Sequence, residues 1–233
     1  MNTVLECTNL TKQYKKSQTA LNNVTISIPS GRIVGLLGPN GSGKTTLLKL
    51  AAGLLAPTEG EIRINGLLPG PATKAAVSYL PDRTYFESFR KVSDLIQFFE
   101  TFYADFNRDK AYHLLSDLGI RPYDRLKSMS KGTKEKMELI LTMSRDASLY
   151  LLDEPIGGVD PAARDYILST IIRNYNPDAS VIISTHLIQD VESVLDDVIF
   201  LKNGEFVLYD SAENIRNSEH NTIDGLFREV FRC

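Results

Sequence analysis

One eight-residue segment, GPNGSGKT at residues 38–45, constrains this chain more than any other. It follows an apolar, β-branched run, Ile33–Leu37, and precedes a helix-like stretch, Thr45–Ala52. The pattern G-x-x-x-x-G-K-[ST] in this context is typical of a P-loop, in which glycines let successive backbone N–H groups point at phosphate oxygens. The helix N-terminus adds its positive dipole end. The segment therefore predicts a strand–loop–helix unit that binds a nucleotide phosphate. The alternative interpretation, a glycine-rich turn that binds no ligand, is given very little weight. In such a loop Lys44 reaches the β- and γ-phosphates, and the Thr45 hydroxyl is a ligand of Mg²⁺.

Length, composition and charge narrow the class of protein around this loop. The 233 residues, 42% hydrophobic and 24% charged, fit one globular domain of generous size. A net charge of −3 gives little weight to a general nucleic-acid binder, because such proteins are usually basic. Cys7 and Cys233 lie at opposite ends of the chain and indicate neither a disulfide framework nor a metal site. We expect a soluble cytosolic protein, since no leader and no apolar run of spanning length are visible, so any membrane role needs a partner chain.

The order of the expected elements predicts an α/β fold with a mainly parallel sheet. Apolar or alternating runs predict strands, and a hairpin with an Asn203-Gly204 turn follows them. The strands are Thr3–Glu6, Val24–Ile28, Ile33–Leu37, Glu61–Ile64, Ala76–Leu80, Leu149–Leu152 and Ser180–Ser184, and the hairpin joins Val198–Leu201 to Glu205–Tyr209. Strands that are separated by helices and apolar on both faces belong in parallel sheets.

Helical patterns dominate from about residue 82 to residue 146. Helices are expected over Val92–Tyr103, Ala111–Leu118 and Lys134–Ser144, and later over Pro161–Tyr175 and from about Leu187. We therefore expect one domain over 1–233, with the α/β core that carries the P-loop over 1–81 and 147–210. The same pattern predicts a helical subdomain over 82–146 and a tail of two short helices over 211–233, to which we assign no role.

Three polar residues follow apolar strands and point to chemistry at one edge of the sheet. Asp153 ends the run Leu149–Leu152, and Glu154 comes next. The carboxyl end of such a strand lies beside the P-loop, where Asp153 is predicted to hold Mg²⁺ and Glu154 to polarise an attacking water. His186 follows another buried strand and could contact the γ-phosphate or orient the water. Two acids that open a loop, and a structural histidine, are the alternatives for these residues taken singly.

Taken together and in this order, the motifs resemble those of the ATP-binding subunit of an ABC transporter, from about residue 3 to residue 210. Residues 38–46 resemble Walker A and residues 149–153 Walker B. The resemblance implies a P-loop NTPase fold of the ABC ATPase type, in which a mainly parallel core sheet carries an antiparallel β subdomain and an inserted α-helical subdomain. Glu154 is similar to the catalytic glutamate, His186 to the switch histidine, and Tyr14 to the aromatic residue that stacks on adenine. Asp160, in Gly158-Val159-Asp160, is similar to the D-loop aspartate that reaches across a dimer interface.

Two segments depart from the common family pattern. The signature loop is Ser130-Lys131-Gly132-Thr133-Lys134 here, where Leu-Ser-Gly-Gly-Gln is common, and it keeps Ser130 and Gly132. Asp82 stands where the Q-loop of the family carries glutamine, and it could still be a ligand of Mg²⁺. Both departures resemble the ABC-2 type exporters of the bacitracin-resistance kind, whose cytosolic ATPases pair with a separate permease.

The resemblance implies ATP and Mg²⁺ as cofactors and assigns roles to residues. The implied catalytic residues are Glu154, His186 and Lys44, and the implied ligands of Mg²⁺ are Thr45, Asp82 and Asp153. The implied nucleotide-binding residues are Tyr14, Gly38, Pro39, Asn40, Gly41, Ser42, Gly43, Lys44, Thr45, Thr46, Asp82, Ser130, Gly132 and Asp160. The resemblance also implies a second ATP-binding subunit, identical or different, a membrane-spanning permease, no nucleic acid, and a place on the inner face of the cell membrane.

Three other functions compete with that of an exporter ATPase. A soluble ABC ATPase acting on nucleic acid or ribosomes would usually carry two cassettes or a long insertion. A nucleotide kinase would leave the signature loop, the D-loop and His186 without a reason. A binding-only regulatory subunit would not need Lys44, Asp153, Glu154 and His186. Near Asp82, the aromatic residues Tyr85, Phe86 and Phe89 could dock a permease helix or could pack inward onto the helical subdomain.

Overall fold

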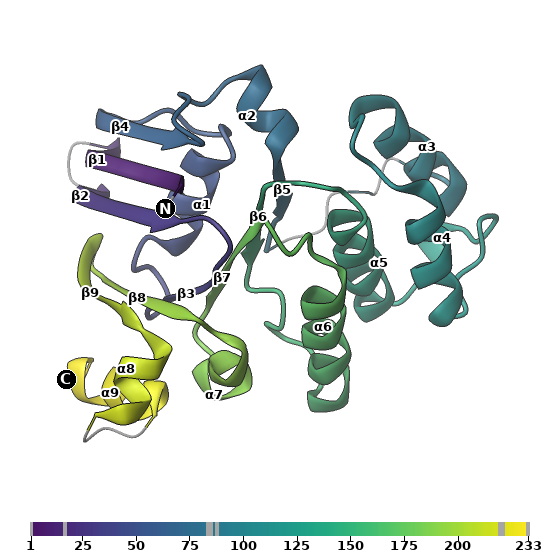
Figure 1. Cartoon of the computed structure of the whole chain (residues 1–233). Coiled ribbons are helices and arrows are strands. Elements are labelled where there is room, and N and C mark those ends of the chain that lie inside the picture. Colours follow the sequence, from purple (N-terminus) through teal and green to yellow (C-terminus); the bar gives the residue numbers. More distant parts are fainter. Residues whose placement is uncertain (1, 16–17, 83–85, 87–88, 219–221, 232–233) are drawn as a thin grey trace.

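The computed structural model describes residues 2–15, 18–82, 86, 89–218 and 222–231, and Figure 1 shows them as ribbons. Its central feature is a six-stranded sheet in the order β5-β6-β7-β3-β8-β9. These strands are β3 (Ile33–Leu37), β5 (Val77–Leu80), β6 (Leu149–Asp153), β7 (Ser180–Thr185), β8 (Asp197–Lys202) and β9 (Glu205–Ser211). All neighbours pair in parallel except β8 and β9, which form an antiparallel hairpin. The prediction of a mainly parallel α/β sheet is therefore confirmed.

A second sheet, antiparallel and in the order β2-β1-β4, lies beside the first. It consists of β1 (Thr3–Lys15), β2 (Gln18–Pro29) and β4 (Glu59–Ile64). Strand β1 is much longer than the predicted Thr3–Glu6. The polar sequence after Cys7 hides this continuation, because the register shifts between Cys7 and Leu10, where Asn9 adopts a left-handed φ of 48°. Such a bulge breaks the period-2 pattern from which strands are predicted.

Helices cover both faces of the parallel sheet. They are α1 (Lys44–Ala51), α2 (Pro71–Ala76), α3 (Val92–Phe102), α4 (Arg108–Asp117), α5 (Lys131–Met143), α6 (Pro161–Asn174), α7 (Ile188–Val191), α8 (Ala212–Asn217) and α9 (Ile223–Val230), with 3₁₀ turns at Leu126–Ser128 and Glu192–Val194. Helix α1 packs between the two sheets through Leu47 and Leu48, whereas α5 to α9 contribute to the cluster on the other face. None of the described helices is long and apolar enough to cross a membrane.

Two helices differ from their predicted positions for local reasons. Helix α5 begins at Lys131 and not at Lys134, because Ser130 Oγ accepts the Thr133 N–H at 3.1 Å and caps the helix. Helix α2 was not expected at all. It spans six residues, too few for a helical period, and is set by Pro71 at its start and by the Thr73 hydroxyl, which accepts the Gly70 N–H.

A third hydrophobic cluster is built from residues 86–141. It joins α3, α4 and one side of α5, while Leu139 and Met143 on the same helix belong to the cluster of the main sheet. In Figure 1, α3 and α4 lie at the end of the molecule opposite the antiparallel sheet. A separate cluster of this kind supports a helical subdomain, for which the boundaries at 82 and 146 remain a proposal.

Arg145 ties this cluster to the main sheet. Its buried guanidinium donates to both carboxylate oxygens of Asp105 and to the backbone carbonyls of Ala75 and Val77. It also lies 4.0 Å from the ring centroid of Tyr103. An arginine that satisfies this many partners at once fixes the geometry of the junction between α5 and β5.

The aromatic residues near Asp82 follow the inward-packing alternative where the structure describes them. Phe86 is buried and makes edge-to-face contacts with Phe89 and Phe99. Phe89 is half-buried, and Tyr85 lies outside the described residues. The exposed rings of this region are instead Phe98 and Phe102 on α3, at 39% and 67% exposure. A docking role for Phe86 is therefore weakened.

Glu138 on α5 is a buried acid within this junction. Its side chain is 3% exposed, and its Oε1 has no hydrogen-bond partner among the described residues. It lines a cavity of about 30 Å³ together with Asp82, Glu135, Asp153 and Glu154, all of them acidic. Desolvation, and secondarily the charge of Glu135, raise the pKa of Glu138 from its ordinary 4.5 to about 8. Glu138 is therefore protonated at neutral pH in the folded chain.

This raised pKa predicts how stability changes with pH. Between about pH 4.5 and pH 8 the folded chain holds a proton on Glu138 that the unfolded chain has lost, so the free energy of unfolding falls as pH rises, by up to ~1.4 kcal/mol per pH unit. Glu138→Gln removes the titrating group and should flatten the curve. In urea unfolding at pH 5, 6.5 and 8, the free energy of unfolding of the variant should increase relative to that of the parent as pH rises. The exposed Glu59→Gln serves as control and should follow the parent; parallel curves for parent and Glu138→Gln would contradict the prediction.

Candidate nucleotide-binding site

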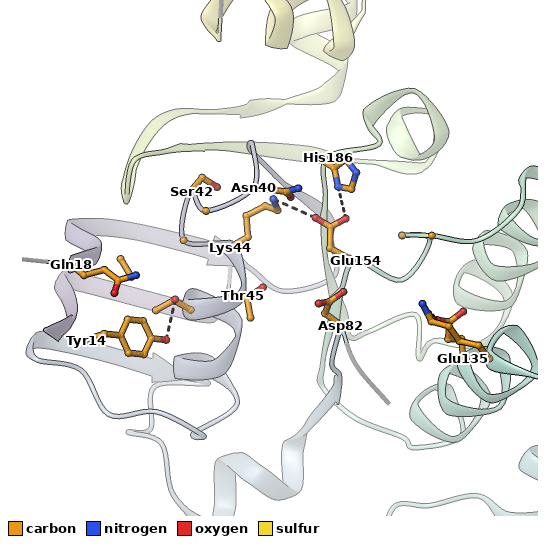
Figure 2. Close-up of a pocket in the computed structure, with 17 residues that line it drawn as sticks. Tyr14, Gln18, Asn40, Ser42, Lys44, Thr45, Asp82, Glu135, Glu154 and His186 are labelled. Atoms are coloured by element: carbon orange, nitrogen blue, oxygen red, sulfur yellow. Dashed lines mark hydrogen bonds and ion pairs between the residues drawn. The ribbon is translucent and has the colours of Figure 1, made fainter. Parts of the chain in front are cut away.

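A polar pocket of about 590 Å³ opens where the P-loop meets the carboxyl ends of β6 and β7 (Figure 2). It is lined by Tyr14, Gln18, Ala20, Asn40, Gly41, Ser42, Gly43, Lys44, Thr45, Thr46, Asp82, Lys131, Glu135, Glu154, Gly157, Gly158 and His186. The parallel register brings these side chains together, because β3, β6 and β7 all end at this edge. The pocket has the size of a small-molecule site.

Glycines are required in the loop at two positions. A Cβ on Gly38 would lie 2.3 Å from the Leu201 carbonyl oxygen, and a Cβ on Gly43 would lie 2.4 Å from that of Ala20. Gly43 also has a left-handed φ of 113° immediately before α1. The loop is thus packed against β8 and β2 on one side and faces the pocket with the other. Gly38 and Pro39 lie outside the lining, but their carbonyl oxygens accept hydrogen bonds from Lys44, at 2.7 and 3.3 Å.

Lys44 is almost completely buried, with 6% of the residue exposed. Besides the two loop carbonyls, its ammonium lies 3.4 Å from Glu154 Oε1. Burial of a cation is costly unless its charge is compensated, and here a carboxylate and two carbonyls compensate it. The ammonium of Lys44 is thus fixed between the loop and Glu154, in the lining of the pocket.

Glu154 is the centre of the polar contacts in the pocket. Its other oxygen, Oε2, lies 3.0 Å from His186 Nδ1, and Figure 2 shows the carboxylate between the lysine and the histidine. The backbone of Glu154 has a left-handed φ of 51°, uncommon for a residue other than glycine. Its N–H donates to the Ser184 carbonyl at 3.0 Å, which fixes this turn against β7. The three residues predicted to be catalytic thus meet around one carboxylate.

Asp153, one residue earlier, lies deeper than Glu154. Its Oδ1 accepts hydrogen bonds from Ser184 Oγ at 2.6 Å and from Thr45 Oγ1 at 3.1 Å. Its Oδ2 is buried and has no hydrogen-bond partner among the described residues. Desolvation raises the pKa of Asp153, and the charges of Asp82 and Glu154 raise it further, against the two hydrogen bonds. A nearby cation would reverse this penalty.

These features fit Mg²⁺, a hard cation that prefers oxygen ligands and is bound through one or two carboxylates plus phosphate oxygens and water. The orphaned Oδ2 of Asp153 and the neighbouring Thr45 hydroxyl are suitable donors. Asp82 is exposed and lines the same pocket, so it can contribute a further oxygen. Within the described residues no group of three or more acidic, histidine or cysteine side chains is arranged to hold a metal ion.

Tyr14 and two residues that sequence reasoning missed form the far side of the pocket. The Tyr14 hydroxyl shares a 3.2 Å hydrogen bond with Thr46 Oγ1, and its ring is 49% exposed. Gln18 and Ala20, at the start of β2, line the pocket next to it, as Figure 2 shows for Gln18. No pattern in the sequence indicates them, because the antiparallel pairing of β2 with β1, the strand that carries Tyr14, is what places them there. A flat ring held by its hydroxyl can stack on a base.

Besides Gly38 and Pro39, three predicted nucleotide-binding residues lie outside this pocket. Ser130 and Asp160 are exposed and Gly132 is half-exposed, and none of them lines it. From α5 the lining instead includes Lys131 and Glu135, which approach each other to 3.5 Å. The structure thus brings together Tyr14, residues 40–46, Asp82, Glu154 and His186, and leaves the signature-loop and D-loop residues apart from them.

Comparison with known proteins identifies the family of the chain. The sequence profile of the family described as "ABC transporter" matches residues 21–157. The chain is 30% identical over 210 residues to the SkfA peptide export ATP-binding protein SkfE of Bacillus subtilis (strain 168), covering 88% of this chain and 87% of the relative.

Solved structures show the same fold. One described as the ATP binding subunit of an ABC transporter covers 99% of this chain and 100% of its own, with 27% identity and a TM-score of 0.86. The ATP-binding cassette MJ0796, in a dimeric post-hydrolysis state bound to ADP and Pi, covers 89% of this chain and 98% of its own, with 21% identity and a TM-score of 0.78. The profile, the relative and the solved structure show that the chain belongs to the ABC transporter family as an ATP-binding subunit.

Proposed function

We propose that this chain hydrolyses ATP with Mg²⁺ and thereby energises a separate membrane permease, as the ATPase of an exporter of the ABC-2 type. The observation that carries the proposal is the Glu154 carboxylate, held between Lys44 and His186 at the mouth of the phosphate-binding loop. A carboxylate in that place can accept the proton of an attacking water, and a lysine beside it can stabilise the charge of the transferred phosphoryl group.

Each residue has a part in this reaction. ATP binds with its base against Tyr14 and its phosphates in the P-loop, where Lys44 exchanges Glu154 for phosphate oxygens. Thr45, Asp153 and Asp82 hold Mg²⁺, which neutralises charge on the phosphates. The exchange frees Glu154 to accept a proton from water as the water oxygen attacks the γ-phosphorus and the bond to the ADP oxygen breaks. His186 orients the Glu154 carboxylate and the leaving phosphate, and ADP and phosphate are the products.

The working form is a head-to-tail dimer, homo- or heteromeric. Support comes from Ser130, Gly132 and Asp160, which lie outside the chain's own pocket and would act on the ATP of a second subunit. Ser130 caps α5, a helix of 13 residues, and such an N-terminus attracts phosphate. A chain of the same fold has been solved as a dimer with ADP and Pi.

We propose that the membrane-spanning part of the transporter is a separate permease chain. None of the described helices can span a membrane, and the relative SkfE is named for peptide export. The exposed rings of Phe98 and Phe102 on α3 offer apolar surface to a membrane chain's cytoplasmic segment. We place the subunit at the cytoplasmic face of the membrane and propose no role in binding nucleic acid.

The first prediction concerns the proposed base. Glu154→Gln keeps the shape of the side chain but cannot accept a proton, so we expect steady-state ATP turnover to fall at least ~100-fold while ATP binding persists. Phosphate release and nucleotide binding would measure the two quantities. Glu59→Gln, on the exposed face of the antiparallel sheet, is the matched control and should turn over ATP as the parent does. Near-normal turnover by Glu154→Gln would sink its assignment as the base.

The second prediction tests the head-to-tail dimer. Lys44→Ala should lose the P-loop half of each site and Ser130→Arg the signature half, so each variant alone should be inactive. In a mixture, half of the dimers pair the two variants, and each such dimer holds one intact site, so about a quarter of parental turnover should return. Detection of mixed dimers without recovered turnover would contradict the arrangement in which Ser130 acts in trans.

The third prediction tests the permease. Co-expressed with the membrane protein encoded beside its own gene, the chain should co-purify in detergent at a fixed ratio. Phe102→Ser should weaken this association, whereas Tyr123→Ser, at 78% exposure on another part of the helical subdomain, should not. A parent chain that stays in the soluble fraction when the membrane protein is present would argue against coupling.

A further inference from the structure

Arg164 contacts two segments that serve different parts of the proposed ATPase cycle. It lies in the first turn of α6, directly after the D-loop residues 158–160. Its Nε donates to the Val159 carbonyl at 3.1 Å, and its Nη1 donates to Asp190 Oδ2 at 2.8 Å. Asp190 belongs to α7, four residues after His186. One guanidinium therefore joins the D-loop to the segment that carries the histidine.

The chemistry of the guanidinium makes this connection stiff. Its nitrogen atoms lie in one plane at fixed angles, so two acceptors held by the same group are also fixed relative to each other. Arg164 and Asp190 are only 26% and 33% exposed, which limits screening by water. The Val159 carbonyl cannot move relative to α7 without breaking one of the two hydrogen bonds.

Helix α7 is held from its other side by the C-terminal tail. Gln189 Nε2 donates to Asp224 Oδ2 at 2.8 Å, and the Asp224 N–H donates to Glu192 Oε2 at 3.2 Å. Ile188 and Val191 are buried in the same cluster as Ile223 of α9. A helix of four residues that is held on both sides moves as one piece, and His186 precedes it by two residues. Displacement of α7 would therefore alter the 3.0 Å contact between His186 and Glu154.

We propose that Arg164 is a positioning residue that holds the D-loop and the His186 segment in one fixed relation. Through Arg164, the engagement of the D-loop by a second subunit sets the position of His186 against Glu154 in the chain's own site. This inference rests on the proposed function, since it presumes ATP hydrolysis in a dimer. It assigns no contact with ATP to Arg164 itself, which does not line the pocket.

Two variants break the connection from either end. Arg164→Gln removes the cation and Asp190→Asn removes its carboxylate partner without changing the shape of the side chain. We expect each to lower maximal turnover about tenfold and to bring the Hill coefficient for ATP toward one, while ATP binding by the isolated monomer stays unchanged. The double variant should lose no more than either single one, because both remove the same interaction.

The control separates positioning from general stability. Arg108→Gln removes a partly exposed ion pair to Glu100, at 3.3 Å, on the helical subdomain, and it should keep parental turnover and cooperativity. Melting temperatures of all variants show whether they are folded. Parental turnover and cooperativity in folded Arg164→Gln would overturn the inference, as would additive losses in the double variant. A parent chain without ATP turnover would instead overturn the proposed function, and the inference with it.

Discussion

The carboxylate of Glu154, shared between the Lys44 ammonium and the His186 ring, is the contact on which the rest of the site depends. The buried charge of Lys44 must be compensated, and Glu154 and two loop carbonyls compensate it. A γ-phosphate competes for the same ammonium and, on binding, would leave Glu154 with a free oxygen. The left-handed turn at Glu154 lets its carboxylate reach both partners. In the proposed mechanism, phosphate binding to Lys44 would therefore release Glu154 to act as the base.

Two other buried acids show that burial alone does not make a reactive group. Asp153 and Glu138 each keep one carboxylate oxygen without a hydrogen-bond partner among the described residues, and burial raises the pKa of both. Asp153 has the Thr45 hydroxyl beside it, so a divalent cation can satisfy it. Glu138 has no hydroxyl donor of that kind among its hydrogen bonds and faces other acids, so a proton satisfies it instead. The neighbouring side chains, more than the extent of burial, therefore decide whether a buried carboxylate binds a metal ion or a proton.

The sequence predicted well where local pattern and burial coincide. Ile33–Leu37 is predicted to the residue because a strand buried on both faces is apolar throughout. The bulge at Asn9 and the six-residue α2 were missed, since neither leaves a periodic signal. The rule for parallel strands assigned the side chains of the site to one sheet edge. It could not predict which of them pair, because the place of Glu154 between Lys44 and His186 depends on the left-handed φ of Glu154. Gln18 was missed for a related reason, because only the register of β2 places it beside Tyr14.

The arrangement of the described residues also implies why hydrolysis would require a partner. The pocket contains the P-loop residues 40–46, Asp82, Glu154 and His186, whereas the capped N-terminus of α5 at Ser130 and the exposed Asp160 lie outside it. If those outlying groups complete the site of another subunit, contact between the subunits must change the geometry of each chain's own site. A loop that moves independently could not transmit this change, whereas Val159 is joined through Arg164 to the helix after His186. A rigid contact of this kind between an outward loop and an inward histidine is one way in which binding at one site can be coupled to another.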